Sequence, residues 1–147
     1  METEKLAKLI ESRHGLLVQL QELSRTQMPL IAEGRLHELF PLLGAKQGLL
    51  ERLAEVDQGL GPFRDQDPAS RHWPSESQRQ HCAARWADCQ TVLAEIVSNE
   101  KEGERMLQAA RNRAAEELRL VSSSRQARAA YAGSLPIPSG SFDLTSQ

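Results

Sequence analysis

The sequence predicts an all-α fold: an elongated antiparallel bundle, or coiled coil, of three helices with a long third helix and a disordered C-terminal tail. Apolar residues recur every three or four positions along most of the chain, as they do on one side of a helix. Only 4% of residues are aromatic, and leucine and small aliphatic side chains dominate, which suits interlocking helices. The stretch from 75 to 121 contains no proline. We therefore expect a helical bundle over residues 1–121 and a flexible Ser/Gly/Pro-rich tail over 122–147.

The first helix is expected over about residues 3–28. Its apolar positions follow helical spacing and are Leu6, Leu9, Ile10, Leu16, Leu17, Leu20 and Leu23. Pro29 is expected to end or kink this helix, because proline lacks an amide hydrogen and crowds the preceding turn. Glu33 and Gly34 are the expected turn.

The second helix is expected over about residues 35–59. Its apolar positions are Leu36, Leu39, Phe40, Leu43, Leu49 or Leu50, Leu53 and Val56. Pro41 leaves two alternatives open: the regular helix begins near Pro41, where a first-turn proline is tolerated, or a short preceding turn is kinked there. Gly59 and Gly61-Pro62 are expected to stop the helix.

The third helix is expected over about residues 75–121, after a loop that contains three prolines. Ser75 and Gln78 match a capping box at its start. The apolar stripe is Cys82, Trp86, Cys89, Leu93, Ile96, Leu107, Ala110, Ala114 and Val121. This stripe is most polar between Asn99 and Glu104, which also contains Gly103, so we expect it to be least secure there. Ser122 to Ser124 are expected to fray the helix into the tail.

Composition and charge exclude several classes of function. The formal net charge of −2 predicts no strong attraction to nucleic acid, and no apolar run reaches the length of a membrane span, so we expect no stable membrane insertion. The N-terminal residues lack the basic-then-apolar order of a signal peptide, so we expect a cytoplasmic protein. Arginines between Arg105 and Arg128 could contact phosphates, but no aromatic residues are interleaved with them. A solvated basic face is the favoured interpretation, and we expect no nucleic-acid partner.

The sequence contains no recognisable catalytic motif, so we expect neither an enzyme nor a cofactor. The best candidate for a metal site combines His72, His81, Cys82 and Cys89. Adjacent helical residues point about 100° apart, and this spacing matches no structural zinc pattern. Two helical turns, about 10 Å, separate the two cysteines, which is too far for a disulfide. We interpret both as reduced, buried core residues.

Three segments together resemble the FlgN-type flagellar export chaperones. They are GRLHELFPLLGAKQGLLERLAEV at 34–56, which includes Lys46 before the pair Leu49-Leu50, NEKEGERMLQAARNRAAEELRLV at 99–121, and YAGS at 131–134. The resemblance implies a non-enzymatic, cytosolic protein that binds the hook-filament junction proteins FlgK and FlgL. Such a chaperone shields a C-terminal amphipathic helix of its client, prevents premature assembly, and delivers the client to the export gate protein FlhA.

The resemblance also implies which residues contact the partners. Carried onto this chain, the client-binding surface is Met106, Leu107, Ala110, Ala114, Leu118 and Val121. Tyr131 is the implied contact with the export gate, and the tail residues that accompany it are Leu135, Ile137 and Phe142. The alternative is a self-associating structural coiled coil without a secreted client, so a homo-oligomer is a possible state.

Overall fold

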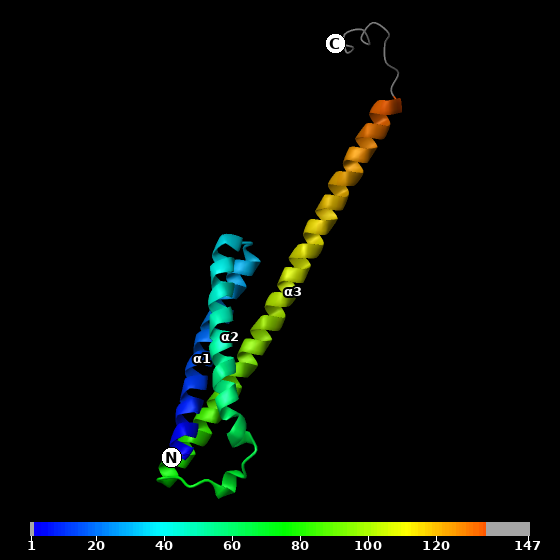
Figure 1. Ribbon diagram of the computed structural model, residues 1–147. Coiled ribbons are helices and arrows are strands. Elements are labelled where there is room, and N and C mark those ends of the chain that lie inside the picture. Colours follow the sequence, from blue (N-terminus) through cyan, green and yellow to red (C-terminus); the bar gives the residue numbers. More distant parts are fainter. Residues whose placement is uncertain (1, 135–147) are drawn as a thin grey trace. The chain divides into compact units, whose positions relative to one another are not determined.

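The computed structural model describes residues 2–134 (Figure 1). The predicted all-α fold is confirmed over this part of the chain, which contains no strand. Its three α-helices are α1 (Glu2–Ala32), α2 (Leu36–Arg64) and α3 (Glu76–Ser134), and a short 3-10 helix, η1 (Pro68–Ser70), lies between α2 and α3. The chain divides into two compact units, Met1–Leu107 and Gln108–Gln147, so α3 contributes to both. The remainder of the predicted tail, residues 135–147, lies outside the described residues.

The core of the first unit consists of three apolar layers along α1. The first layer is Leu6, Ile10, Leu60, Phe63 and Cys82. The middle layer is Leu16, Leu17, Leu20, Leu49, Cys89 and Ile96. The third layer is Leu30, Ile31, Leu39 and Leu42, with Met106 packed against it. Residue numbers rise through the layers in α1 and α3 and fall in α2, so α2 is antiparallel to the other two helices.

One charged side chain is buried between the first and middle layers. Arg13 is 7% exposed, and its Nε donates a hydrogen bond to Asp57 Oδ1 at 3.2 Å. The guanidinium carbon lies 4.8 Å from the centroid of the Trp86 ring, a cation–π contact. Arg13 on α1 therefore contacts both α2 and α3. Its Nη1 is buried and has no hydrogen-bond partner, so the desolvation of this charge is only partly compensated.

A polar network connects the three helices between the middle and third layers. Lys46 on α2 donates to Gln27 Oε1 at 2.8 Å and pairs with Glu100 Oε1 at 2.5 Å. Asn99 Nδ2 donates to Ser24 Oγ at 3.1 Å, and Ser24 is completely buried. The sequence predicts that α3 is least secure here, yet this is where α3 exchanges hydrogen bonds with both other helices.

Gly103 allows α1 and α3 to approach closely beside this network. A Cβ atom at this position would lie 3.1 Å from Gln27 Nε2 and 3.3 Å from Ile31 Cδ1, closer than most real contacts of that kind. The glycine that interrupts the predicted stripe is therefore buried and is a packing feature of the bundle.

The expected helix ends at proline and glycine residues are wrong. α1 continues through Pro29 to Ala32, and α2 begins at Leu36, with Pro41 inside it, so the alternative in which α2 begins near Pro41 is also wrong. Gly59 and Gly61-Pro62 do not stop α2. The physical reason is burial of the residues beyond these positions: Leu30 and Ile31 fill the third layer, and Leu60 and Phe63 fill the first. Burying such side chains yields about 1.5–3 kcal/mol each, enough to offset a missing backbone hydrogen bond.

The expected end of α3 at Val121 is also wrong, because the helix continues to Ser134. Three consecutive serines lower helix propensity by only a few tenths of a kcal/mol each, and the alanines, arginines and glutamine that follow are good helix formers.

The start of α3 agrees with the predicted cap, since Gln78 N donates to Ser75 Oγ at 3.2 Å. The expected turn at Glu33 and Gly34 is present, with φ of +67° at Gly34. Within residues 2–134, no helix combines the length and apolarity that crossing a bilayer requires.

The buried arginine predicts an asymmetric response to mutation. Asp57→Asn leaves the Arg13 charge buried without its carboxylate, and we expect this to lower the free energy of unfolding by about 2 kcal/mol. Arg13→Met removes the charge and the unpaired Nη1 together, retains contact with Trp86, and leaves a partly exposed Asp57, so we expect a change below about 1 kcal/mol. Urea unfolding followed by circular dichroism measures both. A larger loss for Arg13→Met would contradict this assignment.

Candidate helix-binding surface

The α3 residues of the second unit form a helix through local interactions. Arg119 pairs with Glu116 at 2.7 Å, and this hydrogen bonding lowers the pKa of the Glu116 carboxyl. Gln108 Nε2 donates to Asn112 Oδ1 at 3.0 Å. Such pairs contribute about 0.2–0.5 kcal/mol each. Because every side chain from 111 to 133 is exposed, no core reinforces this segment, and most of the stability of helices in proteins comes from such packing. A partner that buried one side of it would therefore stabilise it.

Four of the six predicted client-binding residues lie in this unit and share one side of α3. Ala110 is half-buried and Ala114 is exposed, while Leu118 is 71% and Val121 50% exposed. Their steps of four, four and three residues place them along a helical stripe. Large apolar side chains this exposed on a regular stripe are typical of a surface that binds another helix.

Arginines flank the apolar residues on the same side of α3. Arg111, Ala114, Leu118, Val121 and Arg125 follow one another in steps of three, four, three and four, which is the coiled-coil pattern. We call these five residues the α3 stripe. It presents an apolar centre between two guanidinium groups. A complementary helix would carry apolar residues at its centre and carboxylates toward both ends.

The other two predicted client-binding residues belong to the first unit. Met106 is half-buried and packs against the third layer, so it serves the core. Leu107 is 45% exposed and lines a hollow of about 220 Å³. The other residues that line this hollow are Gln27, Ile31, Leu39, Leu43, Lys46, Glu100 and Glu104. Of the six predicted residues, Met106 thus also contributes to packing of the bundle.

Tyr131 lies on a different side of α3 from the stripe. At about 100° per residue, Tyr131 is roughly 140° around the helix from Leu118 but only about 20° from Leu120. Tyr131 is 68% exposed and Leu120 53% exposed. The second unit therefore presents two separate sets of exposed apolar side chains. The tail residues predicted to act with Tyr131, namely Leu135, Ile137 and Phe142, lie outside the described residues.

A further row of apolar side chains, on α2, is exposed. Leu36, Phe40, Leu43 and Leu50 are between 41% and 63% exposed. The sequence indicates this row through adjacent apolar pairs. Leu39-Phe40 and Leu49-Leu50 each place two apolar side chains about 100° apart on the helix, so one face cannot bury both. The first residue of each pair is buried and the second is exposed.

The structure does not bring the candidate metal ligands together. Cys82 lies in the first layer and Cys89 in the middle layer, both as free thiols whose pKa is raised by burial. His81 Nε2 lies 3.2 Å from Glu11 Oε1, and the carbonyl of His72 accepts a hydrogen bond from Thr3. Within the described residues, no group of three or more His, Cys, Asp or Glu side chains could hold a metal ion.

Neighbouring residues on the buried and exposed faces of α2 should differ in how much their substitution lowers the stability of the protein. Leu39 is 4% exposed in the third layer, so we expect Leu39→Ala to lower the free energy of unfolding by about 2–4 kcal/mol. Phe40 is 63% exposed, so Phe40→Ala should change it by less than about 0.5 kcal/mol. Thermal and urea unfolding test both. Equal losses would mean that Phe40 is buried in the folded protein.

Comparisons of the chain with protein-family models, with curated proteins and with solved structures give no significant match. The case for a function therefore rests on the residues and on the geometry described above.

Proposed function

We propose that this protein is a non-enzymatic export chaperone of the FlgN type, which binds an amphipathic helix of a secreted flagellar subunit through the α3 stripe. The proposed client is a hook-filament junction protein of the FlgK or FlgL kind, held in the cytosol until export. The observation that carries the proposal is the solvent exposure of Leu118 and Val121 on a helical stripe in a segment without a core. The resemblance of residues 34–56 and 99–121 to this class of chaperone supports it.

The energetics of such an interface suit a client that must later be released. Burial of a few hundred Å² of apolar surface contributes several kcal/mol at about 25 cal/mol per Å². Ordering of the client helix and loss of translational freedom consume a large part of this. An affinity in the micromolar to submicromolar range is the expected result.

The charges of the stripe define the client further. Arg111 and Arg125 flank Leu118 and Val121, so the client helix should carry acidic residues near both ends of its apolar face. Exposed ion pairs of this kind are screened by salt, so raising the ionic strength should weaken binding modestly without abolishing it.

The position of Tyr131 suits delivery of a bound client. Tyr131 and Leu120 face away from the α3 stripe, so a client helix on the stripe leaves them accessible. An export gate component of the FlhA kind could therefore contact this second side while the client is still bound. Simultaneous access of this kind is what handing over a client requires.

Charged substitutions on the stripe test the proposal. We expect Leu118→Asp together with Val121→Asp to reduce client affinity at least tenfold, because two carboxylates would have to be desolvated within the interface. The measurement is a calorimetric titration with the C-terminal segment of a hook-filament junction protein from the same organism. Both residues are exposed, so circular dichroism should show unchanged helicity and melting of the bundle.

A matched control adds the same charge on another side of the same segment. Asn112→Asp together with Ser123→Asp should leave client affinity within about twofold, because both positions lie roughly 120–140° from Leu118. Equal effects of the two double variants would contradict recognition through the stripe. The self-associating coiled coil predicts a different pair of results. Light scattering would show a tight dimer that the double variant Leu118→Asp with Val121→Asp dissociates, and the client segment would not bind.

A further inference from the structure

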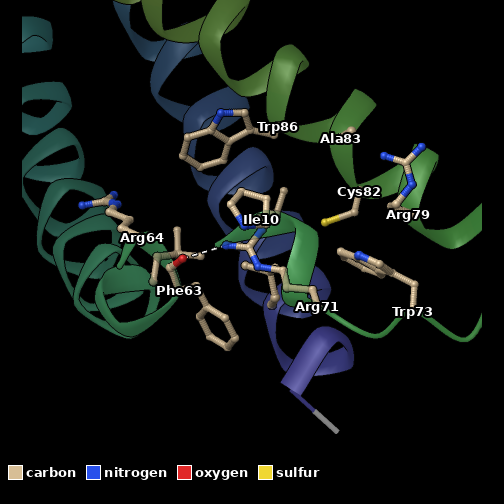
Figure 2. A pocket seen from close by; sticks show the side chains of 12 residues that line it. Ile10, Phe63, Arg64, Arg71, Trp73, Arg79, Cys82, Ala83 and Trp86 are labelled. Carbon is tan, nitrogen blue, oxygen red and sulfur yellow. Dashed lines mark hydrogen bonds between the residues drawn. The ribbon is translucent and has the colours of Figure 1, made fainter. Parts of the chain in front are cut away.

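A second hollow, of about 330 Å³, lies beside the first core layer (Figure 2). Its walls come from α1, α2, η1, the segment before α3 and the first turns of α3. The apolar side chains that line it are Leu6, Ile10, Leu60, Phe63, Pro68, Trp73, Cys82, Ala83 and Trp86. This volume lies near the lower end of the roughly 300–1,000 Å³ of small-molecule pockets, and largely apolar walls are typical of them.

Three arginines complete the lining of this pocket: Arg64, Arg71 and Arg79. None of the described residues that line it is acidic. Arg79 is paired with Glu76, and Arg64 lies 3.5 Å from Asp57. Two of the three positive charges thus already have carboxylate partners.

Arg71 differs, because its hydrogen bonds go to neutral acceptors. Its Nη2 donates to the carbonyl of Phe63 at 2.6 Å, the bond drawn as a dashed line in Figure 2, and its Nε donates to Gln66 Oε1 at 3.4 Å. Among the described residues, no carboxylate forms a salt bridge with Arg71. A half-buried guanidinium of this kind forms stronger charge-assisted hydrogen bonds than an exposed one.

We propose that this pocket binds a small amphiphilic carboxylate, a medium-chain fatty acid or a molecule like it. The carboxylate pairs with Arg71, and the apolar body lies against Phe63 and Trp86. Arg71 is the arginine of the lining for which no carboxylate partner is present among the described residues, so it is the group that a ligand carboxylate would pair with. The hollow accommodates a single alkyl chain, whereas a peptide helix needs an extended groove. This site is separate from the α3 stripe and does not depend on the proposed chaperone function.

The two tryptophans give a direct readout of this pocket. The sequence contains two, and both Trp73 and Trp86 line it. We expect decanoate, below its micellar concentration, to change the tryptophan emission saturably, with one-to-one binding by calorimetry. Acetate, which lacks the chain, should give no change, and decylammonium should bind at least tenfold more weakly because Arg71 repels it. Equal binding of decanoate and decylammonium, or no saturable binding of decanoate, would overturn the proposal.

Two variants test separately whether binding depends on the charge of Arg71 and on the open volume of the hollow. Arg71→Gln should weaken decanoate binding about tenfold, since it removes one charge-assisted pair. Ala83→Phe should block binding by filling the hollow while Arg71 is retained; Ala83 is exposed, so the core is spared. Arg105→Gln is the control, because it removes an arginine that is paired with Glu102 elsewhere on α3. Unchanged decanoate binding by a folded Ala83→Phe variant would contradict the assignment of the site.

Discussion

Burial of apolar side chains distinguishes the two parts of α3, and the rest of the structure depends on that distinction. Cys82, Cys89 and Ile96 are buried in the layers of the first unit, and Met106 packs against the third of these layers. From residue 111 to 133 every side chain is exposed, although apolar residues continue at helical spacing. The first part of the helix therefore builds the bundle. The second part retains an apolar stripe that none of the described residues covers, and this is the basis of the proposed function.

Polar contacts fix the alignment of the three helices more specifically than the leucine layers do. A leucine layer tolerates small shifts, whereas Arg13 must meet both Asp57 and Trp86, and Lys46 must meet both Gln27 and Glu100. These two sets of contacts lie on either side of the middle layer. They hold α1, α2 and α3 in register, so the apolar pocket around Trp86 and the hollow beside Leu107 have defined shapes.

Helical periodicity is sufficient to predict the fold class and the order of the helices, and the capping residues Ser75 and Gln78 predict the start of α3. The prediction failed where local signals opposed long-range burial: the prolines and glycines near 29 and 60 suggested helix ends, but layers formed by distant residues extend both helices past them. The exposed side of α2 is signalled in the sequence only by adjacent apolar pairs such as Leu49-Leu50, because helical spacing alone does not tell which member of a pair is buried. The pocket could not be predicted at all, since it joins Ile10, Phe63, Arg71 and Trp86 from four separate segments.

Hydrogen exchange of the protein alone tests the central claim most directly. Amides of residues 82–106 should be strongly protected, because these residues lie in the segment that packs against α1 and α2. Amides of residues 112–133 should exchange at least a hundredfold faster, because a helix without a core opens readily. Protection of the second segment equal to that of the first would contradict the account, since it would show that the α3 stripe is already buried in the protein by itself.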